Sequence, residues 1–257
     1  MPHSIAVAGK GGTGKTTLAA LLVCRLRHME ENPILAIDAD PDSNLGTMLG
    51  VEAGESVGEL REEVLEQIKN FPPGMSKAAY VESGLHQIIE EADGFDLITM
   101  GRGEGAGCYC YLNTMIRKFS EDLFPSYRWV VMDNEAGLEH ISRRTSANID
   151  ALVVVVGENP ISLNTARTIQ QITEDPKCGI KRRFVVMNMV RPELEEEVRG
   201  RLGELDLEFA GTIPRDPRIE EAVFSGQPLT ALEETAAWES VDTLLRLVVP
   251  GVGAARG

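Results

Sequence analysis

The sequence predicts an α/β protein with a doubly wound, mostly parallel sheet and helices on both faces. Apolar runs of strand length recur along the 257 residues, with helical or polar stretches between them. The run at residues 152–156 is apolar throughout, which is typical of a parallel strand buried on both faces. Polar motifs follow several runs, as expected where ligands bind at the carboxyl ends of parallel strands. No repeat or linker divides the chain, so we expect residues 1–257 to form one domain.

The apolar runs supply the predicted strands, and the stretches between them supply the helices. The strands are predicted at residues 4–8, 34–38, 95–100, 129–133, 151–157, 184–188 and 209–213. The segment 53–93 resembles an insertion, with a charged helical stretch, a Pro-Pro-Gly break and a second helical stretch ending in Glu90 and Glu91. We expect this segment to be a mobile surface. The amphipathic stretch 233–247 is predicted to pack on the sheet as a helix.

Composition excludes several classes of protein. Hydrophobic residues make up 43% of the chain, enough for a full core, and 25 basic against 40 acidic residues give a net charge of −15. This acidity argues against nonspecific binding of nucleic acid or anionic membranes. No apolar run approaches the roughly 20 residues of a membrane span, and the first strand leaves no room for a signal peptide. The four cysteines suit a reducing compartment, so we expect a cytoplasmic protein.

A phosphate-binding loop follows the first predicted strand. Gly9, Gly14, Lys15 and Thr16 fill the spacing GxxxxGK[ST], directly before a helical run. Glycine permits positive φ and close approach of backbone N–H groups to phosphate, and the helix start adds partial positive charge. We expect Lys15 to reach the β- and γ-phosphates and the Thr16 hydroxyl to ligate Mg²⁺. The full set of predicted phosphate-binding residues is Gly9, Lys10, Gly11, Gly12, Thr13, Gly14, Lys15, Thr16 and Thr17.

The second lysine of this loop, Lys10, is not needed by an ordinary phosphate-binding loop. With it, the loop resembles the GKGGxGKTT loop of the deviant Walker A ATPases, the family of MinD, ParA, the nitrogenase iron protein and metallochaperone ATPases. The resemblance implies a P-loop NTPase that hydrolyses ATP. It also implies an ATP-bound homodimer in which Lys10 reaches the nucleotide of the partner subunit.

An acidic motif follows the second predicted strand. Asp38, Asp40 and Asp42 repel one another unless a cation is near, which suits a Mg·ATP site. The segment resembles the DxDPxxN switch I of the same family. This implies that Asp40 orients or deprotonates the attacking water and that Asp38 supports the Mg²⁺ shell through a water. Helix capping by Asp42 or Ser43 is the alternative.

The fourth run ends in a single acid, Asp133, as a Walker B strand does. We expect Asp133 to hold Mg²⁺ opposite Thr16, directly or through a water. Gly137 follows it and suits a switch II turn that moves when the γ-phosphate is lost.

The same resemblance implies that two later segments contact the adenine of the nucleotide. In the family, an Asn after the sixth strand and a Pro-Arg-Asp turn contact adenine. The positions that match here are Asn188, Pro214, Arg215 and Asp216. A buried Asn amide offers both a donor and an acceptor, as the edge of adenine requires. A plain turn is the alternative for residues 214–216.

A glycine-rich segment after the third strand carries Cys108 and Cys110. Two thiolates are too few for a closed tetrahedral site, but a two-fold dimer would bring two pairs together as four sulfur ligands. Thiolates select Zn²⁺, Ni²⁺, Cu(I) or iron–sulfur clusters over Mg²⁺. Packed apolar thiols or a strained disulfide are the alternatives. Cys24 and Cys178 are predicted to be structural or incidental.

The segments 40–44, 102–110 and 133–144 together resemble the CooC-type maturation ATPases, which insert nickel into carbon monoxide dehydrogenase and whose close relatives serve acetyl-CoA synthase. The resemblance covers residues 5 to about 229 and implies that Cys108 and Cys110 bind Ni²⁺ or Zn²⁺ between subunits. His140 is expected to pack or cap beside switch II and not to ligate a metal. No other histidine has a partner at ligand spacing.

The expected function is therefore that of a Mg²⁺-dependent ATPase and metallochaperone with ATP or ADP, Mg²⁺ and Ni²⁺ or Zn²⁺ as its ligands. Lys10, Lys15 and Asp40 are its predicted catalytic residues, and a nickel enzyme of the carbon monoxide dehydrogenase or acetyl-CoA synthase type is its predicted client. The alternatives are a ParA-like DNA-partitioning ATPase, a MinD-like membrane switch, and an electron-transfer ATPase like the nitrogenase iron protein. Acidity opposes the first two, and the lack of a cysteine between Asp133 and His140 opposes the third.

Overall fold

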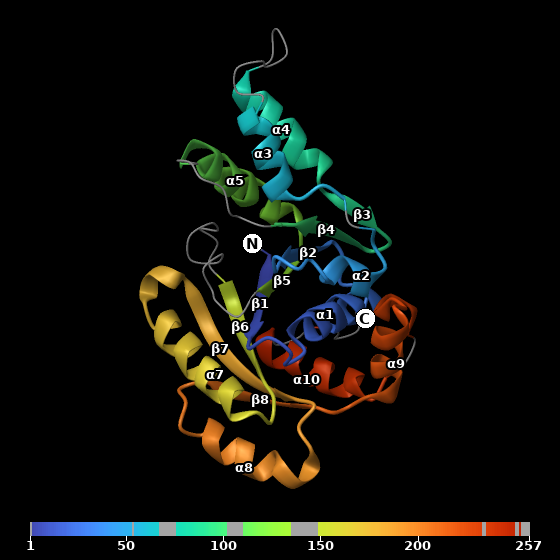
Figure 1. Cartoon of the computed structure of the whole chain (residues 1–257), viewed down its shortest axis with the longest axis vertical. Helices are drawn as coiled ribbons and strands as arrows, with labels where there is room; N and C mark the ends of the chain where they lie inside the picture. The colour runs from blue at the N-terminus through green and yellow to red at the C-terminus, as the bar shows by residue number, and fades with distance from the viewer. Residues whose placement is uncertain are drawn as a thin grey trace.

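The computed structural model describes residues 2–52, 54–66, 76–101, 110–134, 149–232, 235–249 and 252. Its centre is an eight-stranded sheet with the order β3-β4-β2-β5-β1-β6-β7-β8 (Figure 1). Every neighbouring pair is parallel except β3 and β4. The strands are β1 (His3–Gly9), β2 (Ile34–Ala39), β3 (Glu90–Ala92), β4 (Phe95–Thr99), β5 (Trp129–Asn134), β6 (Ile149–Val156), β7 (Ile180–Asn188) and β8 (Glu208–Ile213).

Helices cover both faces of this sheet (Figure 1). Buried side chains of α1, α2, α9 and α10 form the core of one face, and those of α3, α4, α5, α7 and α8 form the core of the other. The helices are α1 (Lys15–His28), α2 (Leu45–Leu49), α3 (Val57–Glu66), α4 (Lys77–Gln87), α5 (Cys110–Leu123), α7 (Pro160–Thr173), α8 (Pro192–Leu202), α9 (Pro217–Ser225) and α10 (Ala237–Val248). The predicted α/β fold is confirmed.

All the predicted strands are present, with shifts at their ends. The largest shift is in β7, which begins at Ile180 although the sequence predicts a start at residue 184. Its first four residues are not fully buried, and they include Lys181, Arg182 and Arg183, so the apolar pattern starts later than the backbone pairing. The predicted C-terminal helix is confirmed as α10, which packs on β8 and α1.

The expectations for the segment 53–93 are wrong in its described part. The helices α3 and α4 are not a mobile surface, because Leu60, Val64 and Leu85 are among the side chains that they bury in the core of one sheet face. The second helical stretch ends at Gln87, and Glu90 and Glu91 belong to β3, an antiparallel edge strand. A tight turn joins β3 to β4 at Asp93 and Gly94, where Gly94 has a φ of +84°. Asp-Gly favours a two-residue hairpin turn, and charged side chains protect an exposed edge.

Candidate functional site

The phosphate-binding loop lies where the central strand β1 ends, and two of its glycines are fixed by close neighbours. A Cβ atom on Gly9, which has a φ of +149°, would lie 2.4 Å from the Val155 carbonyl oxygen. A Cβ atom on Gly14, which has a φ of +85°, would lie 2.3 Å from the Asn188 side-chain nitrogen. Neither position can hold another residue without displacing its neighbour. The two fixed glycines of the motif are therefore required by the strands β6 and β7 as well as by a nucleotide.

Hydrogen bonds inside the loop hold its shape. The Thr13 backbone N–H and hydroxyl both donate to the Lys10 carbonyl, at 3.2 and 2.8 Å. The Asn188 side-chain nitrogen donates to the Thr13 carbonyl at 2.8 Å. Lys15 is buried at the first position of α1, and Lys10 is half-buried at the turn. The loop is thus braced before any phosphate arrives, which lowers the ordering cost of binding one.

Asp133 and Asp38 lie opposite each other on the neighbouring strands β5 and β2, and both are fully buried. Burial raises the pKa of Asp133 to about 7, and the charges of Asp38 and Asp40 add to this rise, while Thr16 and Lys15 oppose it. Burial also raises the pKa of Asp38 to about 6, against hydrogen bonds from the Leu45 and Asp40 amides that lower it. Burial therefore disfavours the charged forms of both carboxylates, and a cation bound beside them would stabilise those forms.

The donor set fits Mg²⁺. Although Thr16 is near enough to lower the pKa of Asp133, neither Asp133 oxygen has a hydrogen-bond partner of ordinary geometry among the described residues. Buried carboxylate oxygens without partners are rare in folded proteins and indicate a missing ligand. Mg²⁺ prefers carboxylate and hydroxyl oxygens and keeps several of its waters, so Asp133 and Thr16 are sufficient protein contacts.

Asp38 has a structural role in addition to the water-mediated support of Mg²⁺ that the resemblance implies, which stays a prediction. Its two oxygens accept from the backbone N–H groups of Asp40, at 3.1 Å, and Leu45, at 2.8 Å. Asp38 therefore fixes the switch I segment and caps α2. The alternative of capping by Asp42 or Ser43 is wrong, because Asn44 is the N-cap position and its side chain makes no capping bond. The Asp40 carboxylate is half-buried and accepts from the Asp42 N–H at 3.0 Å.

Three of the four residues predicted to contact adenine lie together. A pocket beside α1 is lined by Asn188, Pro214 and Asp216, with Leu21 and Ile219 among its apolar walls. Arg215 does not line this pocket: it is exposed and donates to the Met189 carbonyl at 3.4 Å.

Two of these residues also have structural duties that the sequence reading missed. Asp216 is buried and caps α9 by accepting from the Arg218 N–H, and its second oxygen accepts from the Ala236 N–H just before α10. The Asn188 side-chain amide donates one hydrogen bond to the phosphate-binding loop, at the Thr13 carbonyl. The Asn188 side chain therefore joins this pocket to the phosphate-binding loop.

The predicted thiolate site lies outside the described residues. Cys108 and His140 are not described, and of Cys110 only the backbone, as the first residue of α5, is described. Among the described residues, no three His, Cys, Asp or Glu side chains gather as a metal site. Cys24 is buried in α1, where burial raises the pKa of its thiol, and this supports its predicted structural role. We also find no helix in the described part with the length and hydrophobicity that crossing a membrane requires.

Solved structures of MinD proteins have this fold, and one of them was solved with Mg-ADP. The septum site-determining protein MinD from Pyrococcus horikoshii, solved with Mg-ADP, matches with a TM-score of 0.67 at 20% identity, covering 99% of both chains. The MinD cell division protein of Aquifex aeolicus matches with a TM-score of 0.66 at 21% identity, covering 95% of this chain and 96% of that one.

Sequence relatives extend along nearly the whole chain. An uncharacterised ATP-binding protein of Methanocaldococcus jannaschii is 40% identical over 248 residues, which covers 95% of this chain and 98% of the relative. The carbon monoxide dehydrogenase accessory protein CooC of Rhodospirillum rubrum is 29% identical over 265 residues and covers 98% of both chains. The family model of the CobQ/CobB/MinD/ParA nucleotide-binding domain matches residues 4–229. The chain belongs to this family of nucleotide-binding domains, and it is an ATPase of the P-loop type.

Proposed function

We propose that this ATPase is a metallochaperone that captures Ni²⁺ or Zn²⁺ with Cys108 and Cys110 and delivers nickel to an enzyme of the carbon monoxide dehydrogenase or acetyl-CoA synthase type. The observation that carries the proposal is the similarity to CooC, which spans 98% of both chains. The Cys-Tyr-Cys sequence at residues 108–110 supports it, because soft thiolate ligands suit these metals.

The residues that come just before the cysteine segment in the chain are held beside Asp38. The Met100 N–H, where β4 ends, donates to the Asp38 carbonyl at 2.8 Å. Gly101 follows with a φ of +63°, and a Cβ atom there would lie 2.4 Å from the Ser56 hydroxyl oxygen. Met100 and Gly101, which precede the cysteine segment, are therefore held beside the Asp38 backbone. In the proposed cycle, a change at Asp38 on hydrolysis would reach Met100 and Gly101 first.

In the proposed cycle, ATP binds at the loop of each subunit, with Lys15 at the phosphates and Lys10 reaching across a two-fold interface. Bound Mg²⁺, held by Asp133 and Thr16, would neutralise charge on the phosphates. Asp40 holds the attacking water. ATP favours the closed dimer only to the extent that it binds this state more tightly than the open one. Closure pairs the four thiolates, and hydrolysis to ADP separates them.

The test is metal binding by a variant with Cys108→Ala and Cys110→Ala, compared with the matched control Cys178→Ala. Cys178 is a partly exposed thiol far along the chain, so it reports adventitious binding. With ATP present, we expect the double variant to lose Ni²⁺ and Zn²⁺ binding while its ATPase activity persists, and the control to keep both. Full metal binding by the double variant would refute the thiolate site.

A second candidate is assembly of iron–sulfur clusters. The cytosolic Fe–S cluster assembly factor NBP35 of Eremothecium gossypii is 25% identical over 272 residues and covers 98% of this chain and 76% of the relative. Anaerobic purification with iron and sulfide distinguishes the two candidates. A brown protein with cluster absorption that depends on Cys108 and Cys110 would favour this second function over nickel delivery.

A further inference from the structure

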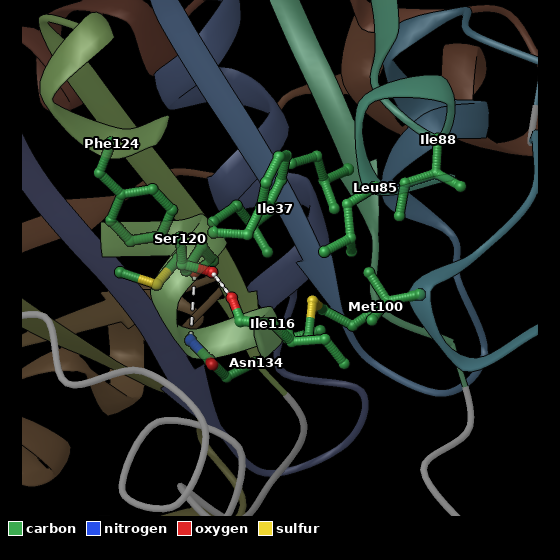
Figure 2. Close-up of a pocket in the computed structure, with 13 residues that line it drawn as sticks. Ile37, Leu85, Ile88, Met100, Ile116, Ser120, Phe124 and Asn134 are labelled. Carbon is green, nitrogen blue, oxygen red and sulfur yellow. Dashed lines mark hydrogen bonds between the residues drawn. The ribbon is translucent and has the colours of Figure 1, made fainter. Parts of the chain in front are cut away.

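Asn134, the last residue of β5, is a buried polar side chain that neither the motif nor the proposed function uses. It is 1% exposed and follows the magnesium residue Asp133 directly. Side chains alternate along a strand, so Asp133 faces the phosphate-binding loop and Asn134 faces the opposite side of the sheet. There Asn134 lines a small cavity between the sheet and α5, together with Ile116 and Ser120 (Figure 2).

The surroundings of Asn134 would suit an apolar side chain better. Apart from Asn134 and Ser120, the side chains that line the cavity are apolar: Ile37, Ala39, Val57, Leu85, Ile88, Ile98, Met100, Ile116, Phe119, Phe124 and Met132. A polar group placed among such residues is costly unless it is hydrogen-bonded. The amide at this position therefore needs a specific reason.

The hydrogen bonds of Asn134 supply that reason. Its side-chain nitrogen donates to the Val7 carbonyl at 3.1 Å and to the Met132 carbonyl at 3.3 Å. Val7 lies opposite Asp133 in the register between β1 and β5, and it is two residues before Gly9. One amide thus joins the strand that carries the magnesium carboxylate to the strand that leads into the phosphate-binding loop, at the end of their ladder.

We propose that Asn134 is a positioning residue for ATP hydrolysis, which fixes the distance between Asp133 and the loop residue Thr16. It acts through the backbones of Met132 and Val7 and does not touch the nucleotide. Groups that hydrogen-bond a metal ligand directly are typically worth about 10- to 100-fold in metal affinity or activity, and Asn134 acts one step further away, so we expect an effect at the lower end of that range. The proposal does not depend on the nature of any metal held by Cys108 and Cys110.

The test is Asn134→Leu in the full chain, because leucine has the same branching and the same number of side-chain heavy atoms and suits the apolar cavity but donates no hydrogen bond. Mn²⁺ binding with ADP, followed by electron paramagnetic resonance, measures the metal site without turnover. The Mg²⁺ concentration that gives half-maximal ATPase activity is the second measurement. Asn134→Ala serves as the second variant, since it also removes both hydrogen bonds and is small enough to fit if leucine is too large.

The matched control is Ser4→Ala. Ser4 is buried at the other end of β1, where its hydroxyl ties β1 to Asp150 of β6 at 3.1 Å. We expect both Asn134 variants to weaken Mn²⁺ binding and to raise the Mg²⁺ requirement about tenfold. Ser4→Ala should lower the melting temperature and leave both metal measurements unchanged. Asn134 variants that melt at lower temperature but bind Mn²⁺ as tightly as the parent would overturn the proposal and leave Asn134 a structural residue.

Discussion

The helices α1 and α5 lie on opposite faces of the same sheet and pack against it very differently. Six consecutive residues of α1, from Leu18 to Val23, are each at most 1% exposed. Among the described side chains of α5, those of residues 114–116 and 118–123, only Ile116 is buried, at 8% exposed, and Met115 and Phe119 are partly buried. A cavity separates α5 from β2, β4 and β5 (Figure 2), whereas α1 inserts among α2, α10 and the sheet.

The two helices differ in packing and also in the ligands that they are expected to bind. The tightly packed helix α1 begins at Lys15 and carries Thr16, so the residues that hold phosphate and Mg²⁺ rest on a fixed support. The loosely packed helix α5 begins at Cys110, the residue for which we propose metal capture. A helix with fewer buried contacts costs less to shift, because small displacements forfeit little dispersion energy. The packing therefore places adjustability on the cysteine side of the sheet.

The largest expected effect is the loss of stability in Leu22→Ala compared with Ile116→Ala. Leu22 is fully buried between α1 and the sheet, and its truncation should cost about 4 kcal/mol of unfolding free energy. Ile116 already borders a cavity, so Ile116→Ala should lower the free energy of unfolding by only about 2 kcal/mol, since fewer neighbours lose contacts. Urea unfolding of both variants measures the difference. Equal losses would show that the two faces are packed alike.

The sequence predicts the central strands and the phosphate-binding loop better than it predicts the β3 edge of the sheet. Continuous apolar runs reveal β1, β5 and β6, and the GxxxxGK[ST] spacing reveals the loop, because both are local patterns. β3 was missed because it has only three residues, two of them Glu, and the informative signal was the following Asp93-Gly94 turn.

Long-range contacts explain what was missed in the site. Asn134 acts on Val7, which is 127 residues away, and Asp216 acts on Ala236, which is 20 residues away. Neither pairing follows from a local pattern, because each depends on the strand order and on where α10 begins. In contrast, the residues predicted at the phosphates and at Mg²⁺ lie within single motifs, and the structure does bring them to one edge of the sheet.

The second prediction concerns the buried charge on the packed face. The pKa of Asp133 is about 7 in the folded protein, and it is about 3.9 in an unfolded chain. Between these values the folded state keeps a proton that the unfolded state has lost, so stability falls as pH rises from about 4 to about 7 and stays low above it. Without Mg²⁺ or nucleotide, we expect Asp133→Asn to raise the free energy of unfolding by about 3 kcal/mol at pH 8 and to leave it unchanged near pH 4.

Thermal unfolding across this pH range measures the gain, and Asp150→Asn is the matched control with the opposite sign. Burial acts to raise the pKa of Asp150, but hydrogen bonds from Lys181 and Ser4 outweigh it and leave the pKa lowered. Asp150→Asn should therefore lose stability above the ordinary Asp pKa and not gain it. An Asp133→Asn variant that is no more stable than the parent at pH 8 would mean that the carboxylate is already compensated. Adding Mg²⁺ and ADP should reduce or reverse the gain, because the variant loses a metal ligand.

The smallest expected effect comes from filling the space under α5. Ser120 lines the cavity, and its hydroxyl donates to the Ile116 carbonyl in the preceding helical turn, at 3.0 Å. Ser120→Leu places apolar atoms in the cavity and replaces serine by a better helix former. We therefore expect the free energy of unfolding to rise by about 1 kcal/mol. Ser225→Leu is the control, since Ser225 makes the same type of bond in α9, to the Glu221 carbonyl, but is exposed.

If Ser120→Leu stabilises the protein and also slows metal release from Cys108 and Cys110, the loose packing of α5 serves metal transfer. A loss of stability would show that the cavity cannot accept a leucine, and that the two faces of the sheet differ less than the packing of α1 and α5 indicates.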